Sequence, residues 1–219
     1  MSQALPPGQR FYELSDLLEA YTDTGYMFSD TAETPGPGLS SYLRIAARDP
    51  ARAATAIDQI DDLLSVGLFA EEIADEVEHL PHIRPPMGTS VEDCLRVTRE
   101  HLRRLLQDPS RVPRTNPQTV WEWNERFPEL GQFLGGYLHQ NYSEFHASPD
   151  DAVHEYATET APENRAQAAQ EITELLAMVA SEEELRTAAS ALGLDLLPPE
   201  GTSLRQWLEI MGRRIAPTS

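Results

Sequence analysis

Apolar residues recur at helical spacing in several parts of the chain, most clearly between residues 127 and 142. There they fall at i, i+3, i+4, i+7 and i+8, which is the spacing of one helical face: Leu130, Phe133, Leu134, Tyr137 and Leu138. Gly135 and Gly136 lie inside this predicted helix, where each costs about 1 kcal/mol relative to alanine. We therefore expect the two glycines to permit the close approach of another helix.

The same periodicity predicts further helices at about 50–66, 70–80, 90–106 and 203–215. Serines are expected to cap four helix starts: Ser90, Ser148, Ser181 and Ser203. The prolines and glycines of Thr31–Gly38 predict a surface loop. Strand-like alternation is weak, the nearest case being Leu192–Pro199, so the predicted fold class is all-α.

The two halves of the chain share an ordered series of matching residues. Phe11–Tyr26 matches Phe127–Tyr142 at an offset of 116, and Pro85–Ser90 matches Pro198–Ser203 at an offset of 113. A colinear series of this kind indicates internal duplication. We predict two tandem five-helix domains, residues 11–106 and 127–216, joined by a Pro-rich linker at 107–126.

Two tryptophans and the single cysteine are interpreted as packing groups. Trp121 and Trp123 lie in the predicted linker, and we expect them to pack into a seam between the domains rather than form an exposed platform. Cys94 occupies the place of Trp207 in the repeat, so we assign it to packing and not to chemistry.

Charge narrows the range of partners. Asp and Glu outnumber basic residues by 36 to 17, and all the basic residues are arginine. This excess of negative charge repels nucleic acid and anionic membranes and favours a basic partner. It can also serve only to keep a protein soluble. One cysteine allows no internal disulfide, and neither an export signal nor a membrane-length apolar run is evident, so we expect a cytoplasmic protein.

The residues that a metal-site argument would start from are two histidines and three nearby acids: His139, His146, Glu129, Glu144 and Asp150. Their spacing fits no metal-ligand pattern, and we expect His139 to hold the turn after its helix by hydrogen bonding. A Gly-rich phosphate loop and a nucleophile elbow are also missing. We therefore expect no catalytic residue, no metal and no cofactor.

The stretch Phe127–Tyr142 resembles the signature of the CdiI-type immunity proteins of bacterial contact-dependent growth inhibition. The matching residues read FPEL, two residues, LGGY, one residue, HQ, a polar residue and an aromatic one, and Phe11–Tyr26 is a weaker copy. The resemblance implies an antitoxin, not an enzyme, that binds and neutralises the C-terminal toxin domain of a contact-dependent growth inhibition system or a related polymorphic toxin. Many such toxins are nucleases with basic surfaces, which an acidic binder matches in sign.

Acidic residues just after the signature helix are the predicted partner-binding set: Glu144, Asp150, Asp151, Glu155 and Glu159. The triple glutamate at 182–184 is interpreted instead as a solvated helix start. Two other functions stay open: an orphan helical scaffold or regulatory interaction protein, and a metal-dependent enzyme centred on His139. The sequence leaves the oligomeric state open as well.

Overall fold

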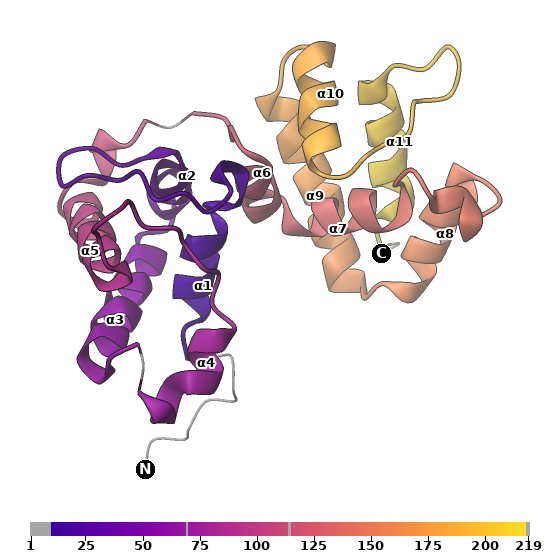
Figure 1. Cartoon of the computed structure of the whole chain (residues 1–219). Coiled ribbons are helices and arrows are strands. Elements are labelled where there is room, and N and C mark those ends of the chain that lie inside the picture. The colour runs from indigo at the N-terminus through magenta and orange to yellow at the C-terminus, as the bar shows by residue number, and fades with distance from the viewer. Residues whose placement is uncertain (1–9, 69, 114, 218–219) are drawn as a thin grey trace. The chain divides into compact units, whose positions relative to one another are not determined.

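The computed structural model describes residues 10–68, 70–113 and 115–217, and within these ranges it holds helices and turns but no strand. The predicted all-α class is confirmed. Met27 and Arg84 form an isolated bridge between two extended segments. The chain divides into two compact units, Met1–Glu122 and Trp123–Ser219, each with its own apolar core (Figure 1).

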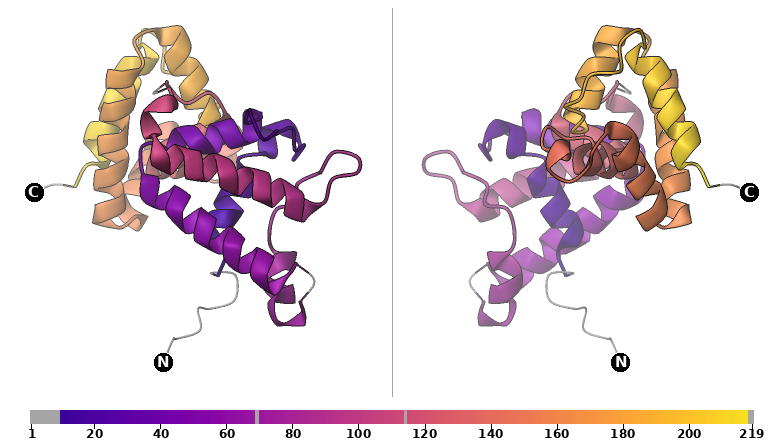
Figure 2. Two further views of the ribbon diagram at one scale, coloured as in Figure 1. Left: turned by 90° about the vertical axis from the view of Figure 1, so that its left-hand side faces the viewer. Right: turned by 90° about the vertical axis from the view of Figure 1, so that its right-hand side faces the viewer.

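Unit 1 contains the helices α1 (Tyr12–Glu19), α2 (Pro37–Ala46), α3 (Pro50–Val66), α4 (Ala74–Glu78) and α5 (Val91–Gln107). Short 3₁₀ turns lie at η1 (Thr22–Thr24), η2 (Glu71–Ile73) and η3 (Pro109–Arg111). Helix α3 packs against both α1 and α5, and Figure 2 shows α3 and α5 running side by side. The core of unit 1 therefore lies among these three helices and α2.

Buried polar contacts fix the helices of unit 1 in register. The backbone N–H of Leu14 donates to Oε1 of Gln59 at 2.8 Å, which joins α1 to α3. Tyr42 and Arg52 both donate to Oε1 of Glu13, each at 2.7 Å. Gln59 and Glu13 thus each have hydrogen-bond partners, as buried polar groups require.

Unit 2 contains α7 (Pro128–Tyr137), η4 (Tyr142–Glu144), α8 (Pro149–Glu159), α9 (Pro162–Met178), α10 (Glu182–Ala191) and α11 (Leu204–Ile215). Helix α9 packs against α7 and α11, and α8 contacts the same two helices (Figures 1 and 2). The apolar stripe predicted for the last helix is confirmed, because its members are all buried: Leu204, Trp207, Leu208, Met211 and Ile215.

Local capping signals locate the helix starts well. Ser90, Ser148, Ser181 and Ser203 each accept a hydrogen bond from the backbone N–H three residues on. The capping box is complete at Ser203, whereas at Ser181 only the serine half is present. Helix α2 begins at Pro37, inside the segment predicted as a loop, because proline is well suited to the first position of a helix.

The prediction that Gly135 and Gly136 both mark a helix crossing is wrong. Nothing lies within 4 Å of a Cβ built on Gly136, which is exposed. A close approach does occur one residue earlier, where a Cβ built on Gly193 would lie 2.5 Å from the Cα of Gly135. The turn after α10, not a helix, therefore comes close to α7.

Helix α6 (Val120–Arg126) lies in the stretch expected as a linker, and the boundary between the units falls within it. Trp121 is 6.1 Å from Tyr42 of unit 1, between ring centroids, and Trp123 stacks at 5.9 Å on Phe127 of unit 2. Each tryptophan thus packs inside a different unit, and a seam between the units stays a prediction. Cys94 is fully buried, in agreement with a packing role.

Candidate partner-binding site

Helix α8, which carries most of the predicted partner-binding residues, starts at a strong local signal. Ser148 accepts the N–H of Asp151 at 3.1 Å, and Pro149 fills the first helical position. Asp150 and Asp151 lie in the first turn, where negative charge is stabilised by the helix dipole. The sequence therefore fixes both the start of α8 and the placement of two of its carboxylates.

Aromatic packing on α7 sets which face of α8 is buried. The Tyr156 ring lies 4.6 Å from Phe133 and 5.2 Å from Tyr137, between centroids, and Val153 is buried beside it. Burial of the Tyr156 hydroxyl, which has no hydrogen-bond partner, raises its pKa to about 12. With this face turned inward, the opposite face of α8 points away from the core.

All five predicted partner-binding residues are exposed. Asp151, Glu155 and Glu159 follow one another at four-residue intervals along α8, so they lie on one face of that helix. Glu144 belongs to η4, the turn that precedes α8. We call the exposed carboxylates of α8 and η4 the acidic face; as a contact surface it stays a prediction.

Three of these carboxylates already have partners within unit 2. Asp150 pairs with Arg214 of α11, and Asp151 accepts the Ser148 hydroxyl at 2.8 Å. Oε2 of Glu155 lies 3.3 Å from Nδ1 of His146, whose side chain is only 7% exposed. These contacts are on the surface, so they position the carboxylates with little effect on stability.

The five residues of the metal-site argument do not gather. Within the described ranges, no three His, Cys, Asp or Glu side chains lie close enough to hold one ion. Nδ1 of His139 accepts the backbone N–H of Asn141 at 3.1 Å, so this histidine holds the turn after α7 as expected. His146 faces Glu155 and stacks on Tyr137 instead.

Sequence reasoning missed Phe145, which lies in the loop between η4 and α8. Its side chain is 73% exposed, although it is a large aromatic residue next to Glu144. Exposed aromatic side chains are a common source of binding energy in interfaces. The sequence held a signal for this exposure. Tyr142 and Pro149 are the only apolar residues three or four positions from Phe145, so Phe145 does not continue an apolar helical stripe.

These features define an all-α chain whose second unit exposes a carboxylate-rich helix face with an aromatic side chain beside it. Residues 126–215, almost the whole of unit 2, match the model of the CdiI immunity protein family. The match covers less than half of the chain and does not extend to residues 11–106, so the duplication stays a prediction. A search of curated proteins and a search of solved structures each gave no match.

In the part of the chain that the structure describes, no helix is both long enough and apolar enough to cross a membrane.

Proposed function

We propose that this protein is an immunity protein that binds and neutralises the C-terminal toxin domain of a contact-dependent growth inhibition system or a related polymorphic toxin. The match of residues 126–215 to the CdiI immunity family carries the proposal. The protein acts by occupying the toxin in the cytoplasm of the producing cell, and it has no catalytic role. Its fold and its toxin contacts need neither a metal nor a cofactor.

The toxin domain is a basic protein, and we propose a nuclease. The formal net charge of the chain is −19, which favours a basic protein and disfavours nucleic acid or an anionic membrane as partner. Catalytic surfaces that bind nucleic acid are themselves positive, so the acidic face is matched to them in sign. Electrostatic attraction of this kind increases the rate of encounter more than it slows dissociation.

The contact surface combines the acidic face with Phe145. An aromatic side chain that enters a pocket of the partner supplies binding energy, while surrounding carboxylates supply orientation. Glu144 and Glu159 are the best probes of this surface, because Asp150, Asp151 and Glu155 already have partners within unit 2. Phe145 is the probe of the apolar contact.

We further propose that unit 1 is a diverged copy of unit 2. Leu14 and Gln59 make the same bond as Leu130 and Glu171, whose distance is also 2.8 Å, with offsets of 116 and 112 along the chain. Gly88 and Gly201 precede the last helix of each unit with φ of +83° and +78°. The family match in unit 2 supports our proposal that this copy binds the toxin.

The test is co-production of the chain with the toxin domain encoded beside it in a sensitive host. Growth should be rescued, and the purified proteins should form a one-to-one complex whose association slows as the screening length falls from about 10 Å at 0.1 M salt to about 3 Å at 1 M. Absence of rescue would refute immunity towards that toxin. Rescue with salt-independent association would keep the function and remove the electrostatic mechanism.

Two sets of variants locate the surface. Glu144→Lys with Glu159→Lys should slow association about tenfold or more at low salt, and Phe145→Ala should accelerate dissociation about tenfold or more. The control Glu200→Lys with Glu209→Lys makes the same charge change at two exposed positions elsewhere in unit 2. Equal effects of the two double variants would mean that overall charge, and not the acidic face, governs binding.

A further inference from the structure

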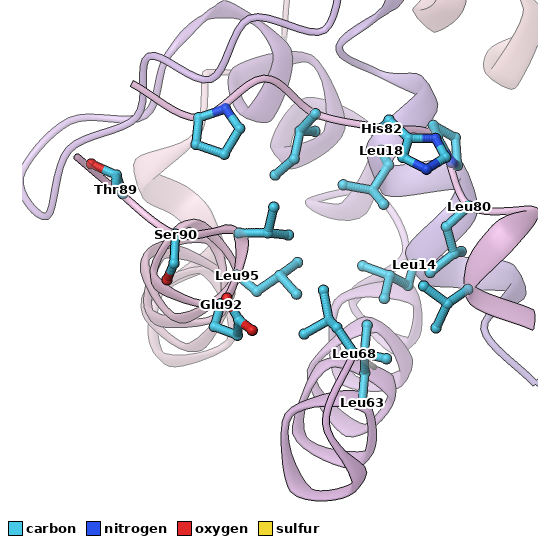
Figure 3. A pocket seen from close by; sticks show the side chains of 15 residues that line it. Leu14, Leu18, Leu63, Leu68, Leu80, His82, Thr89, Ser90, Glu92 and Leu95 are labelled. Carbon is cyan, nitrogen blue, oxygen red and sulfur yellow. The ribbon is translucent and has the colours of Figure 1, made fainter. Parts of the chain in front are cut away.

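Unit 1 contains an apolar hollow that the proposed function does not use. It measures about 580 Å³ and opens between α1, the end of α3, the segment after α4 and the start of α5. Figure 3 shows leucines from several elements pointing toward one another across it: Leu14, Leu18, Leu63, Leu68, Leu80 and Leu95. This size lies within the range of pockets that bind small molecules or the side chains of a partner.

Helix α4, which contributes Val77 to the lining of the hollow, is short. Helix α4 has five residues, whereas α10, at the corresponding place in unit 2, has ten. In unit 2 a cavity of about 330 Å³ is lined by Thr202, Ser203 and Leu204, which correspond to Thr89, Ser90 and Val91 of the larger hollow. Residues of α1 and α3 line the hollow of unit 1, whereas the lining of the smaller cavity includes no residue of α7 or α9.

Polar groups lie on the sides of this hollow, and Glu92 is the acidic residue among those that line it. Thr89, Ser90 and Glu92 lie together on the α5 side in Figure 3, and His82 lies on another side. Glu76 and Glu78 flank the lining residue Val77 on α4. The negative charge of Glu92, with Glu76 and Glu78 on either side of Val77, disfavours a fatty acid or any other anion as ligand and favours a cation with an apolar body.

We propose that this hollow is a second docking site, which receives the apolar face of a basic amphipathic helix from a protein partner. Leucine or similar side chains at i, i+3 and i+7 of that helix enter the hollow, and its lysines or arginines face Glu92 and the acidic residues of α4. The site lies in unit 1, outside residues 126–215, so it does not depend on the proposed toxin contact of unit 2.

A designed peptide tests the site on the full-length chain. A fluorescent leucine–lysine helix of roughly 15–18 residues, with its leucines on one face, is titrated at about 0.15 M salt and followed by anisotropy. A scrambled peptide keeps the charge and loses the apolar face, and a third peptide has glutamine in place of lysine. We expect the first peptide to bind about tenfold or more tightly than either of the other two.

Two variants of the chain place the binding. Leu80→Trp fills the hollow and should weaken the amphipathic peptide about tenfold or more, whereas Glu92→Gln should weaken it about threefold. The matched control is Leu196→Trp, a half-buried lining residue of the smaller cavity in unit 2, and it should leave binding unchanged. Circular dichroism verifies that each variant is folded.

Several results would overturn the proposal. If the scrambled peptide binds as tightly as the amphipathic one, charge attraction alone explains the binding. If the glutamine peptide binds as tightly, a basic partner is excluded. Unchanged binding to Leu80→Trp would move the contact elsewhere. A chain that is itself a dimer, separated by Leu80→Trp, would make a second copy the occupant. If Leu80→Trp unfolds, methyl NMR of the wild-type chain tests the site instead. Methyl signals of Leu68 and Leu80 that do not shift when the peptide is added would refute it.

Discussion

Glu171 and Gln59 do the same local task with different side chains. Each accepts the backbone N–H near the start of the first helix of its unit, from Leu130 and Leu14 respectively. Burial raises the pKa of Glu171 above its ordinary value, with the neighbouring Glu129 acting in the same direction. The carboxylate is therefore held at a cost in free energy that the amide of Gln59 does not incur.

We predict that Glu171→Gln is neutral or stabilising at neutral pH, whereas Glu171→Ala costs about 1–3 kcal/mol because it leaves the N–H of Leu130 unpaired. A raised pKa means that the folded state binds the proton more readily than the unfolded chain. The contribution of Glu171 to stability is thus fully present below its ordinary pKa near 4.5 and declines as pH rises through the folded value.

Urea unfolding of the wild-type chain and both variants over this pH range measures the effect. Relative to the wild type, Glu171→Gln should become more favourable as pH increases. A constant difference at every pH would show that the proton on Glu171 is not linked to folding.

Two glycines of unit 2, Gly193 and Gly136, differ in whether alanine can replace them. Gly193 has a φ of +91° and faces Gly135 too closely to admit a Cβ, whereas Gly136 has open space around it. Gly193→Ala should destabilise by about 1–3 kcal/mol through backbone strain and steric overlap. Gly136→Ala should stabilise by about 0.5–1 kcal/mol, because alanine reduces the freedom of the unfolded chain. Thermal unfolding measures both, and a loss of stability in Gly136→Ala would contradict this account.

At the level of the elements, helix starts could be predicted from the sequence more exactly than helix ends. The helix expected at 50–66 is observed at Pro50–Val66, since Pro50 provides a local start signal behind the cap Asp49. Helix α7 instead ends at Tyr137, although its apolar pattern continues to Leu138, which is also buried. Buried loop residues keep the apolar spacing of a helix, so periodicity alone extends the prediction too far.

The complete capping box of α11 allows an element-level prediction. Ser203 accepts the N–H of Gln206, and the Gln206 side chain accepts the N–H of Ser203, both at 3.2 Å. Ser203→Ala should destabilise unit 2 by about 1 kcal/mol, and Ser203→Asp, which keeps an acceptor, should cost much less. Chemical denaturation followed by circular dichroism measures the difference. Equal losses in the two variants would mean that the serine acts other than as a cap.

At the level of the whole molecule, the sequence predicted the all-α class but not the hollow of unit 1. Val77, Leu80 and Ile83 have apolar spacing like that of any buried segment. Whether such residues fill a space depends on how far α4 extends and on distant contacts with α1 and α3, which no local pattern encodes. Phe145 was missed for a different reason. An apolar residue is expected to be buried, but this aromatic side chain is exposed.

Separate cores predict that unit 2 folds by itself. A fragment of residues 117–219 keeps the whole of α6 and every member of the second core, and a chain of this size can fold without a disulfide or metal. We expect a helical fragment that unfolds cooperatively with a free energy of about 5 kcal/mol. Phe133→Asp, which places a charge in its core, should abolish the transition. A fragment that is unfolded from the outset would show that the two halves are one folding unit.

The rate at which a thiol reagent labels Cys94 reports how often unit 1 opens. It is the single thiol of the protein, it lies fully buried in unit 1, and its surroundings raise its pKa to about 11. A thiol reagent can reach the sulfur only while unit 1 is open, whatever unit 2 is doing at that moment. The labelling rate of the unmodified protein therefore measures the opening of unit 1 alone. A partner that binds and stabilises unit 1 should lower this rate, whereas a partner that binds only unit 2 should leave it unchanged.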